Sequence, residues 1–251
     1  MKPYVKSEII NGCGEVEFYH PKSNSLPHKL LSELSLVIEK LGADHSVRCI
    51  LLKSRGEKTF CAGASFDELI NIKDEVQGKQ FFLGFAKLIL AIKNVPKLVV
   101  TIVQGKVVGG GIGLLCASDY VIAHESASLK LSELSLGIGP FVIAPVLKRK
   151  LGIAHFMNMS LNPKKWKSSD WGLDRGIYSE ISSTKEEMGF RIEQYINDIK
   201  EYSPEAVCEI KTSYWVGFDN LEEEMNEGAE KSGSLVLSDY SREILKQMKL
   251  K

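Results

Sequence analysis

The stretch from Leu98 to Gly113 constrains the fold of this 251-residue chain more than any other. Leu98–Gln104 is a nearly continuous apolar run, which is typical of a strand covered on both faces of a parallel sheet. The sequence Gly105-Lys106-Val107-Val108-Gly109-Gly110-Gly111-Ile112-Gly113 follows directly and predicts a glycine turn that opens a helix. A buried strand followed by a helix indicates an α/β fold with crossover connections.

The predicted secondary structure of the chain changes between about residues 135 and 144. Before this point strand and helix patterns alternate: the predicted strands are 7–19 (two strands around a turn), 47–53, 98–104, 120–123 and 128–131, and the predicted helices are 30–41, 67–72 and 78–92. After it the pattern is helical except for 177–181, with predicted helices at 186–202, 203–215, 220–231 and 238–249. This length suits one good-sized domain with an appendage, or two small domains.

Composition argues against several classes of function. Lys+Arg and Asp+Glu both number 32, so the chain has no overall basic character that would suit nucleic acid, although a local patch stays open. The first ten residues contain no apolar signal-peptide region, and no apolar run is long enough to span a bilayer. Five cysteines without a C-x-x-C pair argue against a disulfide framework or a structural zinc site. We therefore expect a cytoplasmic protein with neither membrane nor nucleic acid as a partner.

Three segments carry residues that a ligand site could use. In Phe60-Cys61-Ala62-Gly63-Ala64-Ser65-Phe66-Asp67 the small residues permit close approach to the backbone, although a compact strand-to-helix turn explains them equally well. The triple glycine at 109–111 fits neither the dinucleotide fingerprint nor the P-loop. Close approach of a ligand to the backbone explains the three glycines better than a need for a flexible loop does. Glu133 is a lone acid in an apolar stretch, and an exposed turn glutamate is its plain alternative.

Taken in order, these segments resemble the crotonase (enoyl-CoA hydratase/isomerase) superfamily over the whole chain. The matching segments are His20–Leu26 for the first loop, Phe60–Asp67 for the A-G-A-D-type loop, Val107–Gly113 for the G-G-G loop, Ser118-Asp119 for the pair that follows it, and Trp171–Ile177 before the C-terminal helices. The resemblance implies an α/β fold, a ββα superhelix over about 1–180, with a helical region at 185–251 that covers the site or serves oligomerisation. It also implies homotrimers or homohexamers, acyl-CoA as the substrate, and no metal or permanently bound cofactor.

The resemblance assigns roles to particular residues of this chain. The two oxyanion-hole donors fall on the N–H groups of Ala64 and Gly110, which would stabilise the enolate of a thioester. One acid falls on Glu133, for which we expect burial, orientation into the pocket and a raised pKa. Further residues expected to contact the substrate are Lys22, Ala62, Ser65, Phe66, Gly109, Gly113 and Phe141. The aromatic residues Phe81, Phe82 and Phe85 could floor an acyl pocket or be ordinary core.

The chain departs from the family pattern at two positions. The family's other glutamate falls on Gly113, and the glycine that usually follows the proline is Phe141. Activation of water by two carboxylates is therefore doubtful, whereas one glutamate can still move a proton between two carbons. The segments 60–69 and 130–140 nevertheless resemble a subgroup of methylglutaconyl-type hydratases. Decarboxylation of a branched acyl-CoA, and an acyl-CoA-binding or RNA-associated protein without catalysis, stay open as alternatives.

Overall fold

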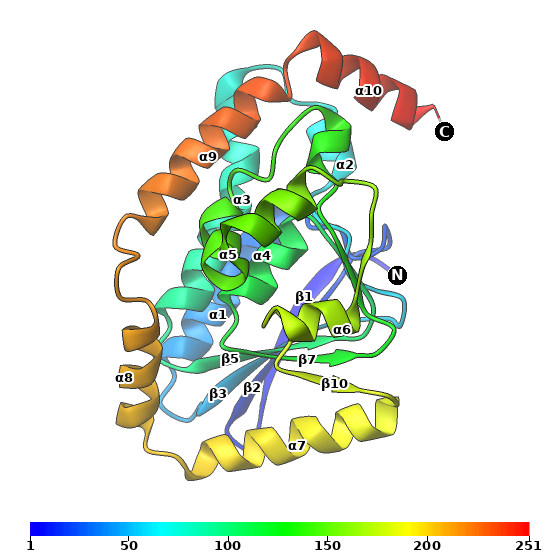
Figure 1. Cartoon of the computed structure of the whole chain (residues 1–251). Helices are drawn as coiled ribbons and strands as arrows, with labels where there is room; N and C mark the ends of the chain where they lie inside the picture. Colours follow the sequence, from blue (N-terminus) through cyan, green and yellow to red (C-terminus); the bar gives the residue numbers. More distant parts are fainter. Residues whose placement is uncertain (251) are drawn as a thin grey trace.

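A computed structural model describes residues 1–250, and its strands form two sheets (Figure 1). The larger sheet has the order β1-β2-β3-β5-β7-β10 and the smaller one the order β4-β6-β8-β9. The strands are β1 (Tyr4–Ile10), β2 (Cys13–Tyr19), β3 (Cys49–Ser54), β4 (Thr59–Cys61), β5 (Leu98–Val103), β6 (Lys106–Val108), β7 (Tyr120–His124), β8 (Ser128–Lys130), β9 (Lys167–Ser168) and β10 (Glu180–Ser182).

Helices follow the strands and then dominate the C-terminal part of the chain. They are α1 (His28–Ala43), α2 (Phe66–Leu69), α3 (Glu75–Asn94), α4 (Gly110–Ala117), a 3₁₀ turn η1 (Glu133–Leu136), α5 (Ala144–Ser160, interrupted at Gly152), α6 (Ser169–Asp174), α7 (Lys185–Glu201), α8 (Pro204–Tyr214), α9 (Leu221–Leu235) and α10 (Asp239–Lys249). Within residues 1–250, no helix combines the length and the apolar character that a membrane crossing requires.

Along the chain, strands are added alternately to the larger and the smaller sheet. Strands β3, β5 and β7 lie side by side and parallel in the larger sheet, and the strand after each one, β4, β6 or β8, joins the smaller sheet in the same order. Each pair of strands is followed by a helix or helical turn. The chain therefore forms a superhelix of ββα turns, which confirms the predicted fold class.

Burial explains why the long elements form where their patterns predict. The central strand β5, with the sequence Leu-Val-Val-Thr-Ile-Val, has five of its six residues buried. In α1 the buried side chains recur at helical spacing, at Leu30, Leu34, Ile38 and Leu41, and join the main core. The small sheet was missed apart from β8, because strands of two or three residues are too short to show an alternating pattern.

The C-terminal helices lie against three different parts of the core. Helix α7 runs along the larger sheet beside β7 and β10, and α9 runs beside α3 (Figure 1). A methyl group built on Gly78 of α3 would lie 2.7 Å from Cα of Gly233 in α9, so the two helices cross with their backbones in contact. Helix α10 contacts η1, which brings the C-terminal helix beside this 3₁₀ turn.

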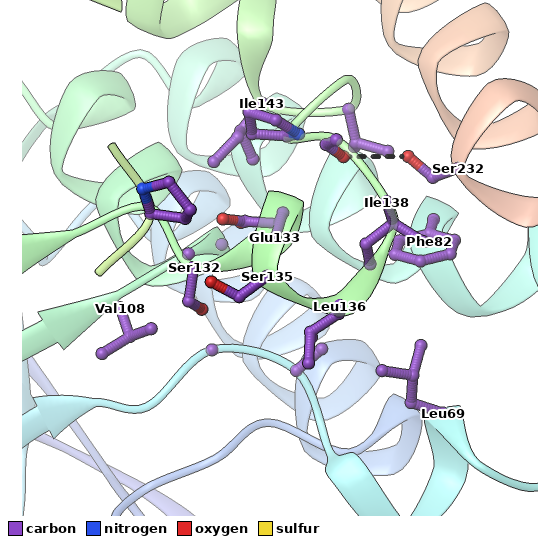
Figure 2. Close-up of a pocket in the computed structure, with 18 of the residues that line it drawn as sticks. Leu69, Phe82, Val108, Ser132, Glu133, Ser135, Leu136, Ile138, Ile143 and Ser232 are labelled. Atoms are coloured by element: carbon purple, nitrogen blue, oxygen red, sulfur yellow. Dashed lines mark hydrogen bonds between the residues drawn. The ribbon is translucent and has the colours of Figure 1, made fainter. Parts of the chain in front are cut away.

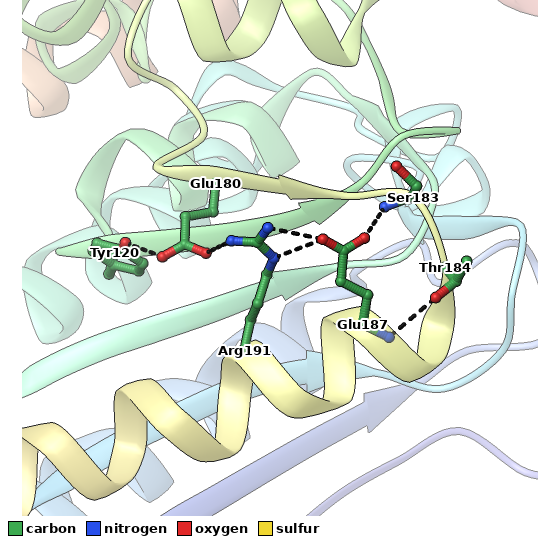
Figure 3. Close-up of polar contacts among 6 residues, drawn as sticks. All are labelled: Tyr120, Glu180, Ser183, Thr184, Glu187 and Arg191. Carbon is green, nitrogen blue, oxygen red and sulfur yellow. Dashed lines mark hydrogen bonds and ion pairs between the residues drawn. The ribbon is translucent and has the colours of Figure 1, made fainter.

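Helix α7 is attached to the edge of the larger sheet by a chain of polar contacts (Figure 3). Tyr120 donates to Glu180, and Arg191 donates to Glu180 at 2.8 Å. The same guanidinium donates twice to Glu187, at 3.1 and 2.8 Å, and Glu187 also accepts the N–H of Ser183 at 2.8 Å. Arg191 holds the pKa of the Glu187 carboxyl below its usual value. Every carboxylate in this group has a partner.

Candidate active site

A cavity of about 440 Å³ lies where the loops after β4 and β6 meet η1. Its walls come from the first loop (residues 62–66, after β4), helices α2 and α3, the second loop (residues 108–110, where β6 ends and α4 begins), β8 with η1, the segment before α5, the loop after α5, and helices α9 and α10. The lining residues are Ala62, Gly63, Ala64, Phe66, Leu69, Phe81, Phe82, Phe85, Val108, Gly109, Gly110, Lys130, Ser132, Glu133, Ser135, Leu136, Ile138, Gly139, Pro140, Phe141, Val142, Ile143, Pro163, Lys164, Ser232 and Met248.

Gly63 allows the first loop, residues 62–66, to lie directly against the second loop. Gly63 has φ +87°, and a methyl group built on it would lie 3.1 Å from the carbonyl oxygen of Val108 and 3.9 Å from the nitrogen of Gly110. Only glycine combines this φ with such an approach without strain. The carbonyl of Gly63 accepts the N–H of Leu26 at 2.8 Å. Ala64, the next residue, therefore starts beside Gly110.

The second loop also requires glycine at consecutive positions. Gly109 has φ +55° and donates its N–H to the carbonyl of Lys130 at 3.0 Å. Gly110 is the first residue of α4, and a methyl group there would lie 2.4 Å from Cε1 of Phe85. Among the hydrogen bonds within residues 1–250, none is donated by the N–H of Gly110 or by that of Ala64. Two backbone donors without partners therefore belong to the walls of one pocket.

Glu133 is the carboxylic acid of this pocket (Figure 2). It is the first residue of η1, and its Oε1 would lie 2.7 Å from a methyl group built on Gly109, so its carboxyl lies against the second loop. Its Oε2 is shielded from solvent and has no hydrogen-bond partner within the described chain. Burial raises the pKa of Glu133 to about 7, against a smaller lowering by the backbone N–H groups of Glu133 and Ser132. Such a carboxyl can accept and return a proton near neutral pH.

Gly113, which we expected to contact the substrate, is not among the residues that line the pocket. Gly113 is buried inside α4, and a methyl group on it would lie 2.6 Å from Cγ2 of Ile143 and 3.0 Å from Cδ1 of Ile89. Ile143 itself lines the pocket. The space that a side chain at position 113 would need is therefore filled by isoleucine, and a carboxylate there would first have to displace it.

The other predicted contact residues divide into two groups. Ala62, Phe66, Gly109 and Phe141 line the pocket together with Ala64, Gly110 and Glu133. Two others, Lys22 and Ser65, do not line it. The exposed Lys22 forms an ion pair with Asp67 at 2.5 Å, and Ser65 caps α2 by accepting the N–H of Glu68 at 3.4 Å.

Among the wall residues that were not predicted, three bear on the function. Met248 comes from α10 at the far end of the chain, and no local pattern of the sequence marks it. Lys130 and Lys164 bring positive charge to a cavity whose other walls are mostly apolar. Lys130 stands three residues before Glu133 at the end of a strand, and this spacing was the available signal for it.

The chain matches one protein family model and is similar in sequence to known proteins. The family model described as enoyl-CoA hydratase/isomerase matches residues 8–239. YngF of Bacillus subtilis is 34% identical over 120 residues, which are 47% of this chain and 45% of YngF. Bacillaene synthase dehydratase PksH of the same organism is 30% identical over 164 residues, 63% of this chain and 62% of PksH. These two alignments thus cover less than two thirds of either relative.

The fold is shared with solved structures. An enoyl-CoA hydratase from Bacillus halodurans superposes with a TM-score of 0.91 at 24% identity, covering 97% of this chain and 99% of the other. The superposition extends over both the ββα superhelix and the C-terminal helices. The family model, which matches residues 8–239, confirms the predicted superfamily.

Proposed function

The chain belongs to the enoyl-CoA hydratase/isomerase family, and from that premise we propose that it moves a proton at the carbon next to the carbonyl of an acyl-CoA thioester. The observation that supports this most is the Glu133 carboxyl, which lies in the same pocket as two unpaired backbone donors and has a pKa of about 7. A base with a pKa near the working pH combines a large deprotonated fraction with adequate basicity.

The N–H groups of Ala64 and Gly110 form the proposed oxyanion hole. Removal of the α-proton turns a thioester into an enolate, and the negative charge develops on the carbonyl oxygen. Two fixed donors stabilise that charge without having to reorganise, and Gly110 adds the favourable field at the N-terminus of α4. Ala62, Phe66, Gly109 and Phe141 would border the bound thioester, since they share this pocket.

Glu133 acting alone favours double-bond isomerisation over hydration. In isomerisation of a 3-enoyl thioester, the carboxylate takes a proton from C2, the dienolate forms, and the carboxylic acid returns the proton to C4. One residue serves both steps, and no water has to be activated. Hydration in this family's two-glutamate manner would use an acid at position 113, where Ile143 and Ile89 leave no room.

Decarboxylation of a branched acyl-CoA is the second candidate. Loss of carbon dioxide produces the same enolate, which needs the two N–H donors and a single acid to protonate it. Glu133 meets this need in its protonated form, and its raised pKa keeps a substantial protonated fraction at neutral pH.

Product analysis in D₂O separates these reactions. The protein is incubated with crotonyl-CoA, 3-methylglutaconyl-CoA and a 3-enoyl-CoA, and the products are measured by mass. We expect the 3-enoyl-CoA to be converted to the 2-enoyl-CoA, with slow or no addition of water to the other two. Rapid hydration of crotonyl-CoA or 3-methylglutaconyl-CoA would contradict the preference for isomerisation. No change in any thioester would favour a catalytically weak acyl-CoA-binding protein.

A pair of substitutions at Gly110 tests the oxyanion hole. Both Gly110→Ala and Gly110→Pro place a side chain against Phe85, but only proline also removes the N–H. The difference between the two variants therefore isolates the donor, and we expect turnover of Gly110→Pro to be lower by a further factor of about 10²–10³. Equal turnover in the two folded variants would refute the assignment.

Three further properties are proposed on the basis of the family. We propose a superhelical core over 1–180 with a helical region at 185–251, assembly into homotrimers or homohexamers, and a cytoplasmic location. Sedimentation of the purified full chain tests the assembly. A monomer at micromolar concentration would contradict it.

A further inference from the structure

Two lysines in the pocket wall have no carboxylate partner. Lys130 is partly buried at the end of β8, and Lys164 is an exposed residue at the rim. Neither makes an ion pair with an acid among the residues that the structure describes, 1–250, whereas eight other lysines do. Unpaired cations that line a largely apolar cavity favour a ligand that brings its own negative charge.

The strand register fixes where the Lys130 side chain points. Lys130 is opposite Val108, and Ser128 is opposite Lys106, so all four residues lie on one face of the small sheet. Val107 and Leu129, on the other face, are buried in the core. Because Val108 lines the pocket, Lys130 stands on the same side of the sheet as the pocket.

Trp166 lies beside this face, and its ring lies close to the ammonium groups of Lys130 and Lys106. The Nζ of Lys130 is 4.4 Å from the centre of the Trp166 ring, and the Nζ of Lys106 is 5.4 Å from it. A ring face partly stabilises a cation but does not neutralise it. Two ammonium groups near one ring repel each other, and an anion bound between Lys130 and the pocket would relieve this repulsion.

The position of Lys130 relative to the reacting group limits which anion it can meet. Its carbonyl accepts the N–H of Gly109 at 3.0 Å, so the lysine begins beside the residue that precedes the proposed donor Gly110. In coenzyme A the long pantetheine arm separates the phosphates from the thioester. A carboxylate on the acyl chain, a few carbons from the thioester, is closer to Lys130 than the phosphates of an extended arm are.

We propose that Lys130, with Lys164 and Trp166, forms a subsite for an anionic group carried by the substrate, and that a second carboxylate on the acyl chain fills it. The natural substrates would then be thioesters of dicarboxylic acids. This inference rests on the proposed function, because it takes the thioester to lie between Ala64 and Gly110. The phosphates of the carrier are the other source of the same chemistry, and the test separates the two.

Binding of saturated thioesters tests the subsite without depending on turnover. Calorimetry compares glutaryl-CoA with butyryl-CoA, and also the two corresponding pantetheine thioesters, which lack the phosphates. The proteins are the wild type, Lys130→Gln, and the control Lys165→Gln, which removes an exposed charge next to Lys164 but outside the pocket. We expect Lys130→Gln to weaken glutaryl-CoA and glutaryl-pantetheine about tenfold, as for loss of a weak charge-assisted hydrogen bond, and to leave both butyryl compounds unchanged.

The other outcomes are equally specific. If Lys130→Gln weakens both CoA thioesters and neither pantetheine thioester, the subsite binds carrier phosphate and the dicarboxylic assignment is wrong. If it changes no affinity more than Lys165→Gln does, no anion subsite exists, while turnover by the wild type would leave the proposed function standing. If the wild type binds none of the CoA thioesters, the proposed function fails as well. Thermal melting of each variant confirms that it is folded.

Discussion

Two glutamates, each in the first turn of a helical segment, have opposite surroundings. Glu187 accepts hydrogen bonds from Arg191 and from the backbone of Ser183, and its pKa is lowered by them. Glu133 has an oxygen with no partner within the described residues, and its pKa is raised to about 7 by burial. The partners of Glu187 stabilise the start of α7 and position Arg191 toward Glu180, whereas Glu133 keeps one oxygen available for a ligand.

A third carboxylate shows that burial alone does not make the difference. Asp119 is almost completely buried, yet its Oδ2 accepts the N–H of Val99 at 2.7 Å and the Nζ of Lys211 at 2.8 Å. The same ammonium also donates to the carbonyls of Ile92 and Lys97, both at 2.8 Å. Burial raises the pKa of Asp119, and its bonds to Lys211 and Val99 oppose this. This pair joins α8 to the core, and the ammonium of Lys211 compensates the charge of the buried carboxylate.

The comparison predicts the largest effect on turnover at Glu133. Glu133→Gln keeps the shape of the side chain and removes the base, so kcat should fall by about 10²–10⁴ while acyl-CoA binding stays nearly intact. Steady-state kinetics and calorimetry with a saturated acyl-CoA measure the two quantities. An unchanged kcat would return Glu133 to the role of an ordinary turn glutamate.

The same variant should be more stable than the wild type at high pH. Because the folded protein holds the Glu133 proton up to about pH 7, whereas an ordinary glutamate loses it near 4.5, the free energy of unfolding falls as pH rises between these values. Glutamine has no proton to lose, and its advantage should be complete above pH 7. Denaturant unfolding at pH 4 and pH 8 checks the sign, and a variant less stable at pH 8 would contradict it.

The largest effect on stability should come from the pair in the core. Lys211→Met leaves the Asp119 carboxylate buried without its cation, which should lower the free energy of unfolding by about 3–5 kcal/mol. Adding Asp119→Asn to this variant should recover part of the loss, since no buried charge is then left alone. Turnover per folded molecule should not change. A large loss of kcat in folded Lys211→Met would show that this pair is not purely structural.

A smaller effect on stability is expected at position 113, where the family's other glutamate is missing. Gly113→Glu forces a side chain against Ile143 and should destabilise the protein by about 1–3 kcal/mol without producing hydration of crotonyl-CoA. Combining it with Ile143→Ala makes room for the carboxylate, and weak hydration should appear only then. Hydration by the single variant would mean that the isoleucine moves more easily than its packing indicates.

The smallest effect belongs to the polar contacts of α7. Tyr120→Phe removes one hydrogen bond to the partly exposed Glu180 and should lower the free energy of unfolding by about 1 kcal/mol. Turnover should be the same as in the wild type. A change in turnover larger than the change in stability would show that this edge of the sheet communicates with the pocket.

Sequence patterns indicated several residues of the pocket wall because these parts of the pocket are local in sequence. The glycines of the second loop indicate an unusual backbone conformation, and the apolar residues around Glu133 indicate that it is buried. Both signals come from residues that are adjacent in the sequence. The contact of Gly113 with Ile143 joins residues thirty positions apart, and Met248 reaches the pocket from the last helix. Such contacts depend on how helices pack, so the filling of position 113 and the partnerless lysines became visible only in the structure.

Exchange of the α-proton of butyryl-CoA with D₂O tests the central claim, that Glu133 is the group that moves the proton. Butyryl-CoA is saturated, so hydration and isomerisation cannot obscure the exchange, which mass spectrometry follows directly. We predict that the wild-type exchange rate rises with pH and reaches half of its maximum near pH 7, where the Glu133 carboxyl loses its proton. Glu133→Gln should abolish the exchange. Exchange that persists in Glu133→Gln with the same pH profile would contradict the account.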